Sequence, residues 1–304
     1  MGSDLGSWRG VLVPLDGSET AARALHPGNA LASSMGVPLY TIGVVDQTAG
    51  VESAERRMRK QLDDLSIQTA GGHVVADASA IHAIGVDATS RGLLVCMASH
   101  GHGRIAGVVL GSVATGVVSQ LDEPVVVIGP KATQGEDQVR LVYVCVDGSP
   151  ATEAILPAAV ALAERTDATI RLVSVVRPTT TVFDLFEDSA EPVPADRYSY
   201  LAQLAASSQT EQTVNHQVIK ARSVASTIID LVRSEPGAVV ALTSHARHGL
   251  GQLMLGSVAG RIVSDSPFPV MLLHSREQTA NSQRSLRTSP SNKTPRSSDK
   301  KARR

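Results

Sequence analysis

The segment that decides the fold occurs twice in the chain. The first copy reads VLVPLDGSETAARAL (11–25), and the second reads VYVCVDGSPATEAIL (142–156). In each copy a short apolar run ends in Asp-Gly-Ser, which is a turn and helix-start signal, and a helical stretch follows. An internal repeat indicates that one structural unit is used twice. We therefore expect a tandem of two related domains.

A second pair of segments repeats further along the chain. These read MASHGHGRIAGVVLGSV (97–113) and LTSHARHGLGQLMLGSV (242–258). Asp16 and Asp147 are 131 residues apart, whereas Ser99 and Ser244 are 145 apart. The difference of 14 residues predicts an insertion in the second copy. The stretch 177–196 is rich in Pro, Thr and acidic residues, which is typical of a loop, and is the natural place for it.

The composition favours an aliphatic core. Hydrophobic residues make up 42% of the 304 residues, but aromatic residues make up only 3%. Continuous apolar runs such as VLVPL, GLLVCMA, PVVVI, AVVALT and PVMLL fit parallel strands that are buried on both faces. So few aromatic side chains argue against a stacking platform for single-stranded nucleic acid.

Strand-like and helix-like segments alternate in each copy. In the first copy we expect strands at 10–16, 38–45, 73–77, 92–98 and 124–129, and helices at 19–35, 51–69, 79–91 and 112–121. In the second copy we expect strands at 139–146, 168–176, 215–220, 237–243 and 269–274, and helices at 150–166, 195–212, 223–235 and 257–265. This alternation predicts the α/β class, with two doubly wound, Rossmann-like, five-stranded parallel-sheet domains in a pseudo-twofold tandem. We place the domains at 8–131 and 138–275.

The formal net charge of −1 hides an uneven distribution. Residues 275–304 hold nine Lys/Arg and two Asp/Glu, which gives +7 and leaves −8 for residues 1–274. Since the segment 276–304 is nearly free of apolar residues, we predict a disordered basic tail. A solvated tail without a specific partner is the preferred interpretation, and contact of KKARR (300–304) with nucleic acid or an acidic partner is the alternative.

The cysteines and the apolar runs indicate a cellular compartment. Cys96 and Cys145 both lie in apolar runs and lack metal-type spacing, so we expect buried free thiols. No signal-peptide pattern and no run of 18 apolar residues is present. We therefore expect a soluble, cytoplasmic protein without contact with a membrane.

Two features of each copy are expected beyond the carboxyl ends of the strands, where ligands bind in open parallel sheets. One is the acid that closes the first strand, Asp16 or Asp147. The other is the glycine-rich loop after the fourth strand, which in the first copy leads through Gly111 into a helix that Ser112 is well placed to cap. The free N–H groups of a helix start favour a phosphate. The loop glycines, which let the backbone come close to such a group, are Gly101, Gly103, Gly107 and Gly111.

This loop has two interpretations. The functional one is a site for a diphosphate or triphosphate. The alternative is a plain helix cap after a flexible loop, because a glycine-rich loop alone is weak evidence. Its position after a buried strand and its repetition in the second copy favour the functional interpretation.

The pattern Gly-x2-Gly-x9-Gly-Ser, with an Asp at the end of the first strand, resembles that of universal stress proteins of the ATP-binding type. The resemblance covers roughly residues 8–274. It is carried by the repeated segments quoted above and by EPVVVI and FPVMLL, which precede or form the last strand of each copy. It implies a tandem protein of the adenine-nucleotide alpha hydrolase-like fold. It also implies pairing of the two halves through their last strands, and assembly of two chains into a homodimer.

The resemblance further implies an adenine nucleotide, ATP with or without Mg²⁺, as the ligand. The base and ribose would lie near the first-strand Asp, and the phosphates in the glycine loop. In the first copy the implied residues are Pro14, Leu15, Asp16, Val44, Met97, Ala98, Gly101, Gly111, Ser112 and Val113. In the second copy they are Cys145, Asp147, Val175, Leu242, Thr243, Ala246, Gly256, Ser257 and Val258.

The two copies depart from the family pattern to different degrees. The first glycine of the pattern is Ala98 in the first copy, which is a small change. In the second copy the first two glycines are Thr243 and Ala246. If these positions need a positive φ or a close approach, side chains there weaken binding. We therefore expect the better site in the first copy, and a weak site or a scaffold in the second.

Other chemistries have less support in the sequence. His100, His102, His245 and His248 lie in the two loops, but no Cys or carboxylate is spaced to complete a metal site, so we expect phosphate-facing or exposed histidines instead. Arg104 and Arg247 either pair with phosphate or remain solvated. The Lys-Ser/Thr ending of a P-loop is missing, and residues 98–121 contain no carboxylate. We expect no catalytic residues and at most slow ATP hydrolysis.

Two function hypotheses follow from different classes. The first is an ATP-binding regulatory protein of the stress response, in which nucleotide occupancy biases binding to a protein partner that is still unknown. The second is a nucleotide-free scaffold that acts through dimerisation alone. A nucleotide-hydrolysing enzyme is a third and weaker hypothesis.

Overall fold

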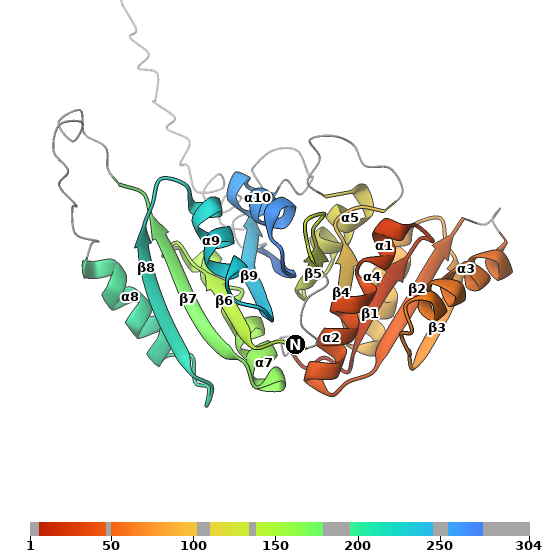
Figure 1. The fold of residues 1–304 in the computed structure, drawn as a ribbon, viewed down its shortest axis with the longest axis horizontal. Coiled ribbons are helices and arrows are strands. Elements are labelled where there is room, and N and C mark those ends of the chain that lie inside the picture. Colours follow the sequence, from red (N-terminus) through yellow and green to blue (C-terminus); the bar gives the residue numbers. More distant parts are fainter. Residues whose placement is uncertain are drawn as a thin grey trace, which may run out of the picture.

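The computed structural model describes residues 6–46, 50–101, 110–133, 138–178, 195–245 and 255–275. The ten predicted strands are all present, and they form one ten-stranded sheet (Figure 1). The predicted tail 276–304 and most of the predicted insertion 177–196 lie outside the described residues.

The first half of the chain builds five parallel strands in the order β3-β2-β1-β4-β5. The strands are β1 (Gly10–Leu15), β2 (Leu39–Val45), β3 (Gly71–Ala76), β4 (Leu93–Ala98) and β5 (Val125–Ile128). The helices are α1 (Glu19–Ala22), α2 (Leu25–Met35), α3 (Val51–Asp64), α4 (Ala80–Arg91) and α5 (Ser112–Gln120).

The second half repeats this plan in the order β8-β7-β6-β9-β10. The strands are β6 (Leu141–Cys145), β7 (Thr169–Val176), β8 (Val214–Lys220), β9 (Ala238–His245) and β10 (Val270–Ser275). The helices are α6 (Pro150–Glu153), α7 (Leu156–Thr166), α8 (Ala195–Ala206), α9 (Val224–Arg233) and α10 (Ser257–Asp265).

The two halves meet through their last strands, which run antiparallel to each other. The β5–β10 ladder pairs Val125 with Leu272, Val126 with Met271 and Val127 with Val270. Counted outward from this ladder, the corresponding strands of the two halves follow in the same order, as a pseudo-twofold tandem requires. The predicted fold class and the pairing of the last strands are both confirmed.

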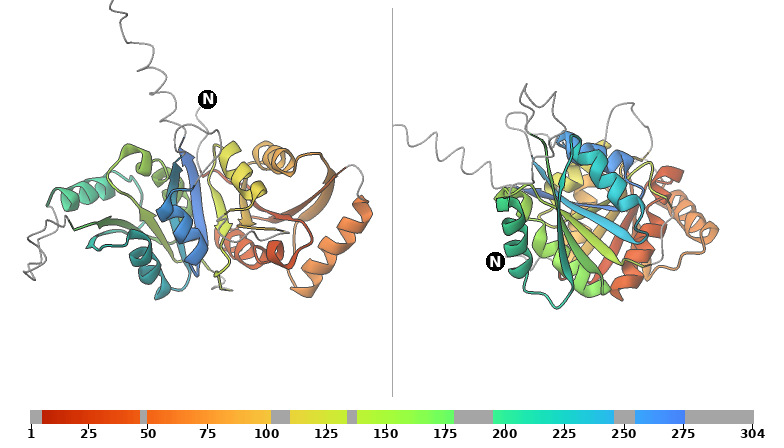
Figure 2. Two further views of the ribbon diagram at one scale, coloured as in Figure 1. Left: turned by 90° about the horizontal axis from the view of Figure 1, so that it is seen from above. Right: turned by 60° about the vertical axis from the view of Figure 1, so that its left-hand side comes forward.

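Helices cover both faces of the sheet and enclose two aliphatic cores (Figure 2). One core holds side chains of α1, α2, α3, α7 and α8, and the other holds side chains of α4, α5, α9 and α10. Every residue of β4 and β5 is buried, because helices pack on both sides of these central strands. This burial explains why the strands read as continuous apolar runs rather than as alternating patterns.

Each helix that follows the Asp-Gly-Ser turn is broken in two, although the sequence predicted continuous helices at 19–35 and 150–166. The breaks separate α1 from α2 and α6 from α7. Pro27 and Pro157 lie near the start of the second piece, and a proline has no N–H to give to the carbonyl four residues earlier. Arg23 and Ala24 instead donate to carbonyls three residues back, at 3.3 and 3.1 Å.

Two further helices end earlier than predicted. The expected helix 51–69 ends at Asp64, and the expected helix 195–212 ends at Ala206. Ser66 and Gln209, just beyond these ends, have φ values of 53° and 44°. Residues in this left-handed region cannot continue a right-handed helix.

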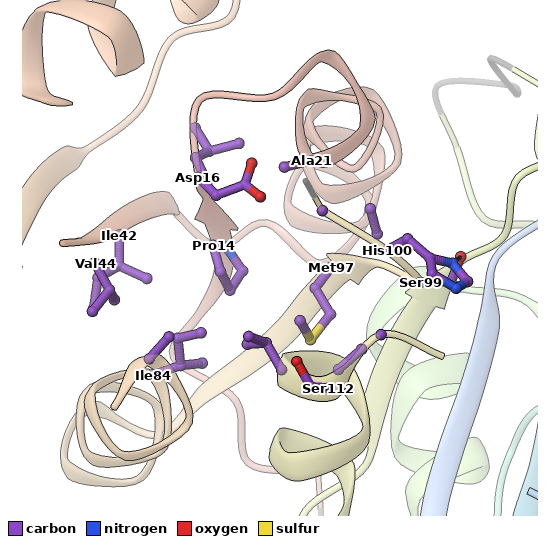
Figure 3. Close-up of a pocket in the computed structure, with 17 residues that line it drawn as sticks. Pro14, Asp16, Ala21, Ile42, Val44, Ile84, Met97, Ser99, His100 and Ser112 are labelled. Atoms are coloured by element: carbon purple, nitrogen blue, oxygen red, sulfur yellow. Dashed lines mark hydrogen bonds between the residues drawn. The ribbon is translucent and has the colours of Figure 1, made fainter. Parts of the chain in front are cut away.

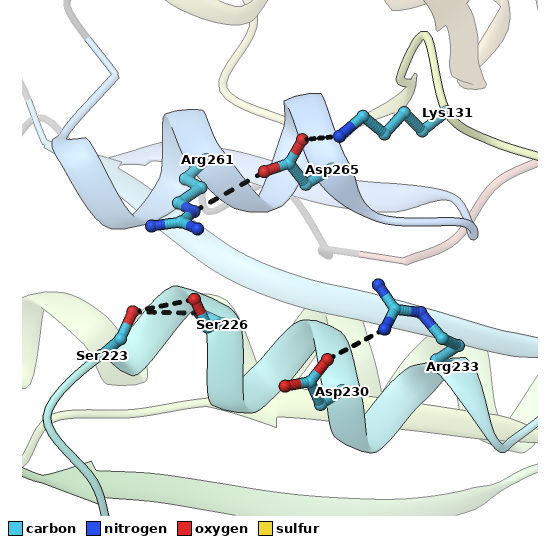
Figure 4. Close-up of polar contacts among 7 residues, drawn as sticks. All are labelled: Lys131, Ser223, Ser226, Asp230, Arg233, Arg261 and Asp265. Atoms are coloured by element: carbon cyan, nitrogen blue, oxygen red, sulfur yellow. Dashed lines mark hydrogen bonds and ion pairs between the residues drawn. The ribbon is translucent and has the colours of Figure 1, made fainter.

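The connection between the halves is fixed against α10. Lys131 donates to Asp265 at 2.6 Å, and Arg261 lies 3.6 Å from the same carboxylate (Figure 4). The N–H of Thr133 also donates to the carbonyl of Pro267 at 3.0 Å. Lys131, followed by Arg261, keeps the pKa of Asp265 below its usual value.

We predict that Gly129→Ala destabilises the seam between the halves. Gly129 follows β5, and a Cβ added there would collide with the backbone carbonyl of Val263 in α10. Backbone has to move to relieve such a collision, so we expect a loss of about 1–3 kcal/mol, measured by thermal or denaturant unfolding. Gly50→Ala is the matched control, since a Cβ at Gly50 meets nothing within 4 Å. Equal stability of the two variants would contradict the packing at this seam.

None of the helices in the described part of the chain combines the length and the apolar character that a bilayer crossing requires.

Candidate functional site

A cavity of about 480 Å³ lies at the carboxyl end of the first-half sheet. It opens where β1 and β4, which are neighbours in the sheet, reach the same rim. After β1 the chain continues to β2 on one side, and it returns to β4 on the other side. This reversal makes the rim a topological switch point, which is where open α/β sheets bind ligands.

The cavity brings together all ten residues that the sequence assigned to the first copy. These are Pro14, Leu15, Asp16, Val44, Met97, Ala98, Gly101, Gly111, Ser112 and Val113. The wall also includes His100, which the sequence singled out, and residues that the sequence did not indicate, namely Ala21, Ile42, Ala80, Ile84, Ser99 and Ala114. Alignment of the two copies could have indicated two of these residues. Ala21 and Ala80 of the first half align with the larger side chains of Thr152 and Val224 in the second half.

Asp16 holds an exposed carboxylate at the rim. Its Oδ1 accepts hydrogen bonds from the N–H and hydroxyl of Ser18, at 2.9 and 2.6 Å. Between them, Gly17 has a φ of 85°, which few residues other than glycine adopt. The Asp-Gly-Ser turn therefore fixes the direction of this carboxylate, which lies on the edge of the cavity (Figure 3).

The start of α5 forms another part of the wall. The structure corrects the prediction that Ser112 caps this helix: Gly111 is the N-cap residue, with no side-chain cap, and Ser112 is the first helical residue. Gly111 itself is fixed by its N–H, which donates to the carbonyl of Ser99 at 2.8 Å. The N–H groups of a first turn have no partner within the helix, so they and the helix dipole attract an anion.

The two described loop glycines do not depend on unusual dihedral angles. In the described part of the chain, neither Gly101 nor Gly111 has a positive φ. A Cβ at Gly101 would collide with the Asp16 carboxylate, whereas a Cβ at Gly111 would meet only ordinary contacts. Close approach of this backbone to a phosphate stays a prediction. Gly103, Gly107, His102 and Arg104 lie outside the described residues.

The other end of the cavity is apolar. Ile42, Val44 and Ile84 gather there, with Pro14 and Met97 next to them (Figure 3). The Asp16 carboxylate, the apolar end and the start of α5 therefore surround the same cavity. This combination suits a ligand with a flat apolar part and an anionic part.

The expectation of a phosphate-facing or exposed His100 is wrong, because the residue is buried at the cavity wall and its imidazole points away from the centre of the cavity (Figure 3). Its Nδ1 lies 3.2 Å from the hydroxyl of Ser99, and its Nε2 is buried without a hydrogen-bond partner. Within the described ranges, no three His, Cys, Asp or Glu side chains converge as metal ligands do. His248, Arg247 and the side chain of His245 lie outside the described part.

A smaller cavity of about 240 Å³ occupies the equivalent place in the second half. Among the residues predicted for this half, Cys145, Asp147, Val175, Leu242, Thr243, Gly256 and Val258 line it. Ser257, the exposed first residue of α10, is absent from this lining, so its predicted place in the site stays a prediction. Ala246 lies outside the described residues.

The two cysteines are free, but they are not equally buried. Cys96 is buried as predicted, whereas Cys145 is only half-buried because it faces the second cavity. Burial raises the pKa of both thiols, and that of Cys145 to about 12. Both thiols are therefore protonated near neutral pH.

We predict slow and selective alkylation of these thiols. Only the thiolate reacts, so a pKa of about 12 should make Cys145 react with iodoacetamide far more slowly than a free cysteine at pH 8.5. Cys96 should not react until the protein unfolds. Mass spectrometry with Cys145→Ser as the control identifies the labelled site. Rapid labelling of native Cys96 would contradict the burial described here.

Comparison with known proteins shows the family. The sequence pattern of the universal stress protein family matches residues 7–129 and again residues 139–274, so the chain belongs to this family. It is 25% identical, over 198 residues, to a universal stress protein of Mycolicibacterium smegmatis, with 63% of this chain and 65% of that protein covered. A universal stress protein of Mycobacterium tuberculosis is 28% identical over 158 residues, with 48% and 57% covered. The chain thus spans less than two thirds of the length of either relative.

Solved structures show the same fold at low sequence identity. A universal stress protein from Archaeoglobus fulgidus aligns with a TM-score of 0.60 and 17% identity, covering 88% of this chain and 99% of that one. A putative universal stress protein from Pseudomonas aeruginosa aligns with a TM-score of 0.58 and 14% identity, covering 93% and 99%.

Proposed function

We propose that the chain is an ATP-binding regulatory protein and that ATP binds in the first-half cavity. The observation that carries this proposal is the wall of that cavity, where the Asp16 carboxylate and the uncapped start of α5 share one space with an apolar end. Its volume of about 480 Å³ falls within the range of small-molecule sites. Membership of the universal stress protein family supports the same ligand class.

Each part of the ligand has a matching part of the wall. The adenine fits between Ile42, Val44 and Ile84. A ribose hydroxyl donates to Asp16, which as a carboxylate can only accept hydrogen bonds. The phosphates lie at the start of α5, where the free N–H groups and the helix dipole favour negative charge. Asp16 is the one acid among the described residues of this wall, so phosphate oxygens and water would hold most of the coordination sphere of any Mg²⁺.

The same wall supports binding rather than turnover. Hydrolysis needs a positioned water and a group that takes its proton. Among the described wall residues, Asp16 is engaged by Ser18 and the His100 ring points away from the cavity. We therefore propose that ATP occupancy regulates binding to a protein partner, in a cytoplasmic homodimer.

The alternative is a scaffold of the same fold that acts through dimerisation without nucleotide. The small cavity of the second half favours this interpretation for that half, since about 240 Å³ is below the usual range for a ligand site. If the scaffold alternative holds for the whole chain, neither half binds nucleotide.

Calorimetric titration with ATP, ADP and AMP tests the proposal. We expect ATP to bind, and we expect Asp16→Ala and Gly111→Val to weaken binding at least tenfold with little change in unfolding temperature. Gly111 has φ −64° and ψ 164°, which valine can adopt. Asp63→Ala is the control, because Asp63 is an exposed acid of α3 outside the cavity. Unchanged ATP affinity of both site variants would refute the placement of ATP in the first-half cavity. Absence of ATP binding by the wild type would favour the nucleotide-free scaffold.

A time course of phosphate release tests the proposal that the site binds ATP with little or no hydrolysis. We expect at most slow release with saturating ATP, at a rate that Gly111→Val lowers further. Rapid turnover that depends on Asp16 would instead favour an enzyme.

A further inference from the structure

We infer that three side chains of the second half, Thr152, Val224 and Thr243, close its cavity to nucleotide, and that alanines at the matching positions keep the first cavity open. This inference rests on the proposed function, because it assumes that the first half binds ATP. It assigns the choice between a nucleotide site and a closed cavity to three positions.

The two halves are a matched pair at the rim of the sheet. Asp16 follows the first strand of its half directly and Asp147 follows its own after Val146, and the glycines after them have φ values of 85° and 87°. In each half the next serine donates to the carboxylate from its N–H, at 2.9 Å in both cases. The backbone of this turn is therefore the same in both halves, and the described walls of the two cavities differ in their side chains.

Thr152 stands where the first half has Ala21, since both lie five residues after the rim aspartate. The Thr152 hydroxyl lies 3.0 Å from Oδ1 of Asp147 and accepts from the N–H of Asp147 at 3.2 Å. The side chain is 8% exposed. Ala21 offers no such hydroxyl. Thr152 thus contacts Asp147 as a ribose hydroxyl would contact Asp16.

Thr243 stands where the first half has Ala98, in the last part of the fourth strand of each half: Ala98 ends β4, and Thr243 lies two residues before the end of β9. It is 5% exposed, and its hydroxyl is buried without a hydrogen-bond partner. Helix α6, which carries Thr152, is in contact with β9, so the two threonines narrow the cavity from neighbouring elements.

Val224 stands where the first half has Ala80, as the first residue of its helix. The serines before them, Ser79 and Ser223, cap α4 and α9 in the same way, with N–H···O distances of 3.3 and 3.4 Å. Both positions line their cavities. Each of the three replacements adds two heavy atoms to the wall, and the cavity volume falls from about 480 to about 240 Å³.

Reciprocal exchange tests the inference. The opening variant is Thr152→Ala/Val224→Ala/Thr243→Ala, and the closing variant is Ala21→Thr/Ala80→Val/Ala98→Thr. Every new residue already occupies the matching position in the other half, so both variants should fold, which unfolding temperature and circular dichroism check. Loss of the unpartnered Thr243 hydroxyl also removes a destabilising group.

The readout is the number of ATP molecules bound per full-length chain, measured by calorimetry at saturation. We expect one for the wild type, two for the opening variant and none for the closing variant. Ala21→Thr alone should weaken ATP binding at least tenfold, which keeps the test available if the triple closing variant does not fold.

The outcomes separate this inference from the proposed function. Two ATP molecules on the wild type, one on a folded opening variant, or full-affinity binding by a folded closing variant would each overturn the inference while leaving the first-half site in place. No ATP on the wild type would overturn the proposed function, and the inference with it.

Discussion

The antiparallel ladder between β5 and β10 is the interaction on which the rest of the structure depends. It consists of three residue pairs, but it turns two five-stranded sheets into one. Without it, the apolar run of β5 would be an unpaired edge, which is a site for aggregation. Because the ladder is antiparallel, it relates the halves by an approximate twofold axis, and β3 and β8 are the edge strands of the sheet that the described residues form.

The parallel direction within each half is the second constraint. It brings the ends of β1, β2 and β4 to one rim, so that Asp16, Val44 and Ala98 surround the same cavity although they are far apart in sequence. The crossover after β4 then places the start of α5 at this rim. Duplication of the chain repeats these backbone features in the second half, where the side chains differ.

The fold was largely predictable because buried parallel strands leave long aliphatic runs in the sequence. The pairing of β5 with β10 could not be predicted from the local sequence pattern. It was predicted only through the family resemblance. The broken helices have a local cause in Pro27 and Pro157, but the helical pattern around them was stronger. The early ends at Ser66 and Gln209 were not predictable, since neither residue type favours a positive φ.

The site was predictable where a residue is chemically distinctive, as with Asp16 and Gly111. Ala21 and Ala80 were missed because a small apolar residue in a helix has no signal of its own. Thr152 becomes meaningful only when it is aligned with Ala21. The cap was misplaced by one residue because Gly111 and Ser112 are both common helix starts, and only the backbone distinguishes them.

If ATP binds as proposed, the first turn of α5 contacts its phosphates and the equivalent turn of α10 does not. Proton–nitrogen NMR of the isotopically labelled chain, titrated with ATP, distinguishes the two turns. We expect large amide shifts for Ser112, Val113 and Ala114, and small ones for Ser257, Val258 and Ala259. Shifts of equal size in both turns, or shifts in neither at saturating ATP, would contradict it.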